Sequence, residues 1–90
     1  MDSLSDIAGL LRAARALADL SQNELADRAK VSRQMVARIE NAGKGIPFEA
    51  IEKVRNALER EDVEFFPATA THGPAIALRK GKKRNPPKSA

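Results

Sequence analysis

Apolar side chains recur every three or four positions along most of the first 60 residues, and this period predicts amphipathic helices. The first helix is expected to begin after Ser5, a good N-cap, with Asp6 in its first turn where the helix dipole favours an acid. It is expected to end near Asp19. Its predicted core-facing stripe comprises Ile7, Leu10, Leu11, Ala14 and Leu17.

Three further helices are predicted before residue 61. Ser21 and Glu24 have the spacing of a capping box, and Ser32 offers a third N-cap. The helix after Ser32 is expected over residues 33–41, and a loop at residues 43–47 separates it from a last helix over roughly residues 48–60. The positions expected to be buried on these helices are Leu25, Ala26, Ala29, Val36, Ile39, Ile51, Val54 and Leu58.

The hydrophobic period changes after Asp62. Residues 63–66 and 75–79 are predicted to be strands, and the turn-rich residues 67–74 between them predict a β-hairpin. Residues 80–90 lack apolar periodicity and are predicted to be disordered. The expected fold is therefore mainly α: a four- to five-helix bundle over residues 1–62, a hairpin over residues 63–79 and a tail over residues 80–90.

Composition excludes several classes of protein. The chain of 90 residues contains no cysteine, which excludes disulfides, thiolate zinc sites and cysteine nucleophiles. A single histidine, no tyrosine, no glycine-rich phosphate loop and no metal-ligand spacing argue against an enzyme, a cofactor or a metal. No apolar run approaches the roughly 18 residues that cross a bilayer, and the chain opens on an acid rather than a basic export signal. We expect a cytoplasmic protein with no membrane partner.

The net charge of +4 is unevenly distributed. Residues 1–60 hold ten basic and nine acidic residues, whereas residues 67–90 hold six basic residues and no acid. The basic excess is therefore largely a property of the tail, and it predicts a polyanionic partner without separating DNA from RNA or a membrane surface.

Two short helices separated by a tight break, inside a small bundle, are typical of a helix-turn-helix. Because Val36 and Ile39 must anchor the second of these helices to the core, its opposite face is obliged to point outward. The major groove of DNA admits such a helix, where arginine can bind guanine and glutamine can bind adenine through two hydrogen bonds each. The outward residues are Ser32, Arg33, Gln34, Ala37 and Arg38.

The motifs SQNELA at residues 21–26, VSRQ at residues 31–34 and RIEN at residues 38–41 strongly resemble the XRE family of regulators, which includes phage Cro and repressor DNA-binding domains. The resemblance covers roughly residues 8–61. It implies a bacterial or phage transcriptional regulator, such as a repressor, that binds a palindromic operator in double-stranded DNA as a homodimer. When bound to DNA such a protein is associated with the nucleoid.

The resemblance also implies roles for individual residues. Base contacts are implied for Arg33, Gln34 and Arg38, which lie on the recognition helix over about residues 33–41. Arg15 and Glu40 match a partly buried structural ion pair that ties the first helix to the third. The implied DNA-backbone contacts are Gln22, Lys30, Ser32, Asn41 and Lys44.

The sequence departs from the family pattern in three places. Lys30 stands at the turn position usually filled by glycine, so it is expected to adopt a left-handed conformation at a cost of about 1 kcal/mol. Gly45 and Phe48 stand where relatives often carry basic residues, which weakens phosphate binding from that side. The predicted hairpin replaces the last helix and dimer surface of phage repressors.

The hairpin leaves two alternatives open, because an isolated two-stranded hairpin is marginal in water. Its apolar face must pack on the bundle or pair with another chain, and edge pairing across a two-fold axis is the preferred hypothesis. The residues expected in that dimer contact are Val63, Phe65, Ile76 and Leu78.

Other readings compete with DNA recognition. The outward residues of the recognition helix could form a solvent-exposed face with no binding function. An antitoxin or antiactivator type of protein-interaction module, with a protein partner and secondary DNA binding, is the main alternative function, and the phenylalanine-bearing strand favours it. Binding of RNA or a membrane through the tail alone is a third possibility, and it predicts no preference among duplex sequences.

Overall fold

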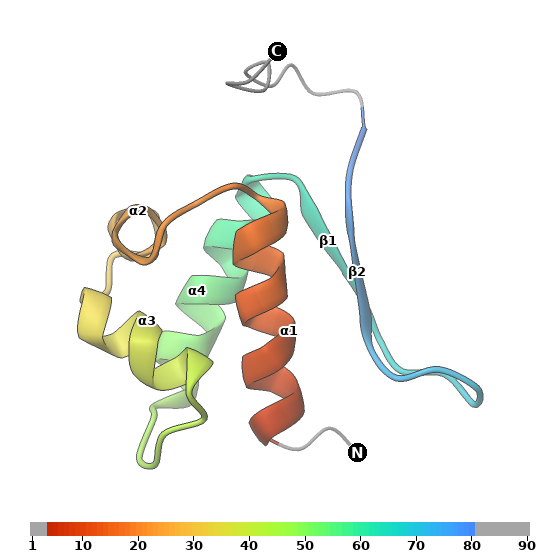
Figure 1. The fold of residues 1–90 in the computed structure, drawn as a ribbon, viewed down its shortest axis with the longest axis horizontal. Coiled ribbons are helices and arrows are strands. Elements are labelled where there is room, and N and C mark those ends of the chain that lie inside the picture. The colour runs from red at the N-terminus through yellow and green to blue at the C-terminus, as the bar shows by residue number, and fades with distance from the viewer. Residues whose placement is uncertain (1–3, 81–90) are drawn as a thin grey trace.

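A computed structural model describes residues 4–80 of the chain. Its elements follow the order of a small helical bundle that ends in a two-stranded antiparallel sheet (Figure 1). The mainly α fold class is therefore confirmed, with four helices and a C-terminal hairpin. The elements are α1 Leu4–Leu17, α2 Gln22–Ala29, α3 Arg33–Glu40, α4 Phe48–Arg60, β1 Val63–Phe66 and β2 Ala75–Leu78.

The elements form three successive layers. Helices α1 and α4 occupy the middle, with α2 and α3 on one side and the hairpin on the other (Figure 1). Strand β2 packs on α1 and β1 on α4, while α2 and α3 contact each other and α4. The hairpin and α3 consequently lie on opposite sides of the bundle, so a partner on one leaves the other accessible.

The core is aliphatic, as expected from a chain with three phenylalanines and no tryptophan or tyrosine. Among the described residues, Phe48 and Phe66 are exposed and Phe65 packs at the edge of the core. Small alanines on α1, α2 and α4 allow the helices to approach closely. The largest fully buried side chains are Leu25, Ile39, Leu58, Val36, Val54 and Val63.

Helix α1 differs from the prediction in its start and in its buried stripe. It begins at Leu4, so Ser5 lies inside the first turn and is not the N-cap. Leu17 was expected in the core but is 39% exposed, whereas Ala18 is buried. The helix ends at Leu17, and the chain turns at Asp19, which has a φ of 61°. The helical period used to predict the buried stripe therefore does not continue past Leu17. The buried stripe is Ala8, Leu11, Ala14 and Ala18.

Local capping explains where α2 and α3 begin. The Ser21 amide donates to Glu24 Oε1 at 2.8 Å and the Glu24 amide donates to Ser21 Oγ at 3.0 Å, which is the predicted capping box. The Met35 amide donates to Ser32 Oγ at 3.0 Å, so Ser32 caps α3 as predicted. Asn41, the expected last residue of α3, is instead its C-cap and lies just outside the helix, which ends at Glu40.

The hairpin packs on its own bundle. In its register Val63 pairs with Leu78 and Phe65 with Ile76, and all four side chains face the core. Val63 is only 1% exposed, because β1 follows α4 directly and lies against it. The apolar face of the hairpin therefore packs on the bundle of its own chain, which was the first of the two alternatives. Val63 has no exposed surface with which to contact a second chain. The second strand ends at Leu78 and not at Arg79, whose amide instead donates to Asp62 O at 2.7 Å.

The predicted disordered tail lies outside the described residues, apart from Lys80. Within residues 4–80, no helix combines the length and the apolar character needed to span a membrane.

Candidate nucleic-acid interface

The turn between α2 and α3 is closed by a left-handed residue. Lys30 has φ 61° and ψ 43°, the conformation expected where relatives use glycine. Its amide donates to Ala26 O, and the Val31 amide reaches the same carbonyl at 3.1 Å. Helices α2 and α3 pack on each other across this tight turn, and Ala26, which accepts both hydrogen bonds, is 4% exposed.

Helix α3 divides into a buried face and an exposed ridge. Val36 and Ile39 are 0% and 1% exposed and anchor the helix to the core. With those two positions buried, the ridge formed by Ser32, Arg33, Gln34 and Arg38 is exposed to solvent. The structure thus presents on one surface the side chains whose chemistry suits base edges.

Arg38 has a contact that the sequence did not suggest. Its guanidinium donates a hydrogen bond to the backbone carbonyl of Lys44, and the Gly43 amide donates to Arg38 O at 2.8 Å. A Cβ on Gly43 would lie 3.3 Å from that carbonyl oxygen, which explains why a glycine suits the position. Arg38 therefore braces the loop after α3 from the exposed ridge.

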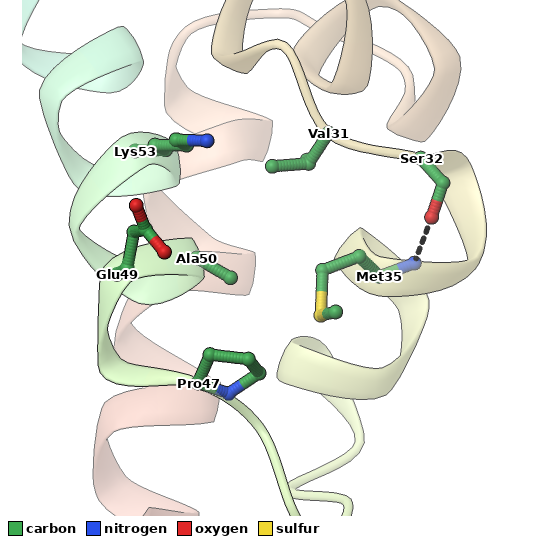
Figure 2. A pocket seen from close by; sticks show the side chains of 7 residues that line it. All are labelled: Val31, Ser32, Met35, Pro47, Glu49, Ala50 and Lys53. Carbon is green, nitrogen blue, oxygen red and sulfur yellow. Dashed lines mark hydrogen bonds between the residues drawn. The ribbon is translucent and has the colours of Figure 1, made fainter.

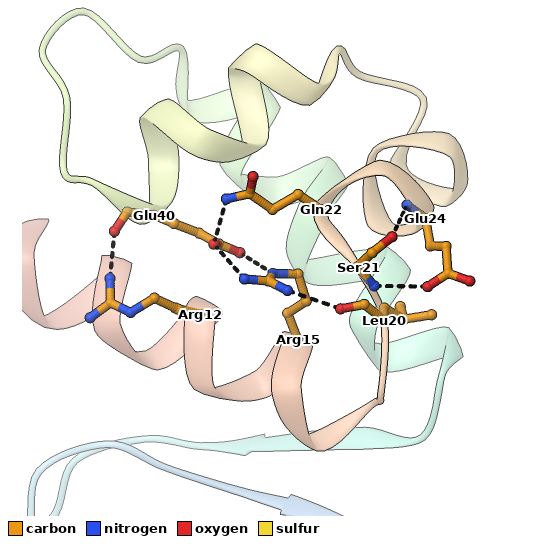
Figure 3. Close-up of polar contacts among 7 residues, drawn as sticks. All are labelled: Arg12, Arg15, Leu20, Ser21, Gln22, Glu24 and Glu40. Atoms are coloured by element: carbon orange, nitrogen blue, oxygen red, sulfur yellow. Dashed lines mark hydrogen bonds and ion pairs between the residues drawn. The ribbon is translucent and has the colours of Figure 1, made fainter. Parts of the chain in front are cut away.

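Glu40 is the only buried charged residue among the described positions, at 4% exposure. Arg15 Nε donates to Glu40 Oε2 at 2.7 Å and Arg15 Nη2 donates to Oε1 at 3.1 Å (Figure 3). Gln22 Nε2 donates to the same Oε1 at 3.1 Å. Arg12 Nη1 adds a hydrogen bond to the backbone carbonyl of Glu40 at 2.6 Å. The expected pair of Arg15 and Glu40 is present, and it belongs to a larger network.

This network fixes the relative positions of three helices. It joins the C-terminal half of α1, the first residue of α2 and the last residue of α3. Arg15 Nη1 also donates to Leu20 O at 3.0 Å, which ties down the α1–α2 link. The hydrogen bond from Arg15 to Glu40 raises the pKa of the guanidinium, opposed by its partial burial and reinforced by the charge of Glu40.

Gln22 lies at the start of α2 as expected, but its amide nitrogen is engaged with Glu40. Neither this contact nor that of Arg12 was predicted from the sequence. The spacing of three residues between Arg12 and Arg15 puts both on one face of a helix and is the signal that could have found the second arginine. No local pattern links Gln22 to Glu40, because 18 residues separate them.

The partners of the cations distinguish the α3 region from the rest of the described chain. Most arginines have an ion-pair or hydrogen-bond partner. Arg28 pairs with Glu61 at 3.1 Å, Arg79 lies 3.6 Å from Glu64, and Arg60 donates to a backbone carbonyl. The basic side chains of residues 4–80 with no such partner are Lys30, Arg33, Lys44, Lys53 and Lys80.

The first four of these cations surround α3. Lys30 precedes the helix, Arg33 is its first residue and Lys44 lies in the loop that follows it. Lys53 comes from α4 and lines a groove with Val31 and Ser32 at the N-terminal end of α3. Lys53 was not predicted from the sequence, because only the packing of α4 beside α3 brings it there (Figure 2). Free positive charge thus accumulates around the exposed ridge, which favours a polyanion on this face.

Residues 4–80 contain no group of three or more histidine, cysteine, aspartate or glutamate side chains that could hold a metal ion.

Comparison with known proteins agrees with the geometry. The model of a family described as helix-turn-helix matches residues 11–65, from Leu11 in α1 to Phe65 in β1. A search of curated proteins found no match. The matched segment contains the capped pair α2 and α3, the turn at Lys30 and the exposed ridge. The chain therefore belongs to the XRE-type helix-turn-helix family of DNA-binding regulators.

Proposed function

We propose that this protein is a transcriptional regulator that recognises a specific sequence in double-stranded DNA by inserting α3 into the major groove. The observation that carries the proposal is the coincidence of the exposed ridge on α3 with the unpaired cations Lys30, Arg33 and Lys44. A major groove about 12 Å wide accepts a helix, and phosphates on both sides of the groove attract these charges. The protein acts in the cytoplasm, on the nucleoid.

Arg33 and Gln34 are proposed to read bases, because they stand in the first turn of α3 with no protein partner. Arg38, at the far end of the ridge, is proposed as a third base contact. On binding DNA its guanidinium would leave the carbonyl of Lys44 and bond to a base. The backbone contacts proposed are Gln22, Lys30, Ser32, Asn41 and Lys44, which flank the ridge.

In vitro selection of duplex sites from a random pool, read at two salt concentrations, tests this proposal. The expected result is a palindromic motif. Arg33→Ala is expected to weaken binding to the selected site by about 1–3 kcal/mol and to relax preference at one base pair. A matched control is Arg55→Ala on α4, whose side chain is engaged by Glu59 and the ring of Phe65. Indifference of the wild-type protein among duplex sequences would refute the function.

The protein is proposed to act as a homodimer through the hairpin. The inward face of the sheet is covered by α1 and α4, so a second copy would meet the exposed edge of β2 and extend the sheet to four strands. A two-fold axis normal to that sheet would leave both copies of α3 facing the same side, since α3 lies across the bundle from the hairpin (Figure 1). The two recognition helices must then be about 34 Å apart to meet one face of the duplex.

The dimer is tested on the outward face of β2, because Ile76 packs against the core and its replacement would damage the monomer. Ala77 is exposed and pairs with Glu64. Ala77→Lys is expected to convert a dimer into a monomer at micromolar concentration, since it brings like charges together near the two-fold axis. Sedimentation velocity measures this, with Ala68→Lys in the hairpin loop as the control. A wild-type monomer at these concentrations would exclude the hairpin dimer.

A protein-interaction module, of the antitoxin or antiactivator type, is the second candidate. Phe66 on the outward side of β1 is 43% exposed, and an exposed aromatic side chain is typical of a protein contact. The two candidates predict different binding partners. A protein that co-purifies stably with this chain, together with no preference among duplex sequences, would favour the protein-interaction module.

A further inference from the structure

The outward side of α1 carries apolar residues that the rest of the described chain leaves uncovered. Leu17 is 39% exposed, and the other positions of this face are exposed or half-buried. Their spacing of three and four residues places them on one side of the helix. This face is called the α1 stripe, and its residues are Gly9, Leu10, Ala13, Ala16 and Leu17.

The α1 stripe adjoins the hairpin. A groove of about 480 Å³ is lined on the helix side by Gly9, Leu10 and Ala13 and on the hairpin side by Gly73 and Pro74, which directly precede β2. Within residues 4–80 the sheet has two strands, so one edge of β2 has no neighbouring strand. Because β1 packs on α4 and β2 packs on α1, that free edge lies on the α1 side of the sheet (Figure 1).

Gly9 has no steric reason within its own chain. It lies inside α1, where a glycine costs about 1 kcal/mol relative to alanine. A Cβ at this position would lie 3.7 Å from Arg12 Nη2, an ordinary van der Waals distance, and would meet no atom of another described element within 4 Å. Its φ is not positive. Close approach of a second chain is a physical reason for a glycine on this face.

We propose that the α1 stripe forms a second layer of the homodimer contact, packed on the α1 stripe of a second copy of this chain. This inference rests on the homodimer proposed above. An edge of four residues is about 14 Å long and covers only a small part of the roughly 800 Å² per partner that a standard stable interface buries. The uncovered apolar surface that adjoins this edge is the α1 stripe. It contains no charged residue, so it does not repel its own copy.

The spacing of paired strands accounts for the small residues of the stripe. Paired strands lie about 4.8 Å apart, whereas packed helices usually lie about 8–10 Å apart. Pairing β2 with its copy therefore draws together the two α1 helices on which these strands pack, more closely than large side chains allow. Gly9, Ala13 and Ala16 present at most a methyl group and permit this approach. A two-fold axis normal to the sheet makes the two helices antiparallel.

Cysteine cross-linking tests this geometry, because the chain has no cysteine of its own. At least one of Ala13→Cys and Ala16→Cys is expected to give a disulfide-linked dimer under mild oxidation, since Cα atoms within about 7 Å of each other can be bridged. The matched control is Asn56→Cys at an exposed position of α4, which is expected to run as a monomer on a non-reducing denaturing gel.

Added volume on the stripe tests the same contact without a covalent bond. Ala13→Met is expected to weaken the dimer about tenfold in sedimentation velocity, whereas Asn56→Met on α4 should leave it unchanged. Gly9→Ala is expected to raise the unfolding temperature of the dilute monomer, because alanine favours a helix, and yet to weaken the dimer about threefold. Circular dichroism of each variant separates lost association from lost folding.

The inference is overturned if neither cysteine variant cross-links in a protein that dimerises, or if folded Ala13→Met dimerises like the wild type. Either result leaves the hairpin dimer and DNA recognition intact. Equal cross-linking of Asn56→Cys would also overturn it, because random collision would then explain the disulfide. A wild-type monomer at micromolar concentration would refute the homodimer and this inference together, and selection of a duplex motif would still test DNA recognition separately.

Discussion

The guanidinium of Arg38 donates a hydrogen bond to the backbone carbonyl of Lys44, six residues later in the chain. The last turn of α3 and the loop that carries a candidate phosphate contact are thereby held as one unit. Arg38 also has an exposed side chain on the ridge proposed to face DNA. The same arginine is therefore positioned to brace the loop in the free protein and to reach a base in the complex.

Arg38→Ala is expected to loosen the loop. Loss of one hydrogen bond worth about 1 kcal/mol predicts that backbone amides at residues 43–46 exchange with solvent about fivefold faster. Amide exchange followed by NMR measures this directly. Arg33→Ala, at the opposite end of the same helix, is the control and should leave those amides unchanged. Equal protection of the loop in both variants would show that the Arg38 contact does not hold it.

Lys30→Gly is expected to change stability and DNA affinity in opposite directions. A non-glycine residue at φ 61° is strained, so glycine should raise the free energy of unfolding by about 1 kcal/mol. Loss of the positive charge should at the same time weaken binding to all duplexes. Urea unfolding and titration of the selected site give the two values. A variant that is both more stable and unchanged in affinity would remove Lys30 from the backbone contacts.

Arg15→Met is expected to be strongly destabilising, because Glu40 would remain buried with only Gln22 as a side-chain donor. The expected loss in the free energy of unfolding is about 3–5 kcal/mol. The double variant Arg15→Met with Glu40→Met should recover much of that loss, since two apolar groups of similar volume replace the pair. Urea unfolding of the single and double variants checks this. If the double variant is as unstable as the single one, the cost lies in packing and not in the unpaired carboxylate.

Deletion of residues 80–90 is expected to weaken binding to every duplex to the same extent. The segment carries five basic residues and no acid, so it contributes counterion release without reading bases. The salt slope should become less steep, and the selected motif should stay the same. A chain of equal length with glutamine in place of the five basic residues is the control for length. A deletion that abolished sequence preference would assign recognition to the tail.

Features set by neighbours in the chain could be predicted from the sequence alone. The capping box of Ser21 and Glu24 and the cap of Ser32 involve atoms three residues apart, so residue identity was enough to locate the starts of α2 and α3. The outward ridge followed in the same way, because burial of Val36 and Ile39 determines the opposite face of a short helix. The pair of Arg15 and Glu40 was expected from the family resemblance rather than from any local rule.

Tertiary structure decided which side chains are buried and which residues of different elements come into contact. Whether Leu17 or Ala18 enters the core depends on where α1 ends and which elements cover it. The face of the hairpin that holds Val63 is buried because α1 and α4 are there to receive it. Gln22 reaches Glu40, and Lys53 reaches the N-terminal end of α3, only after helices far apart in sequence are packed together. The sequence by itself determined the helix-turn-helix and its exposed ridge, because the period and capping of a helix are local. The polar network behind that ridge and the groove beside it arise from contacts between helices, which no local pattern contains.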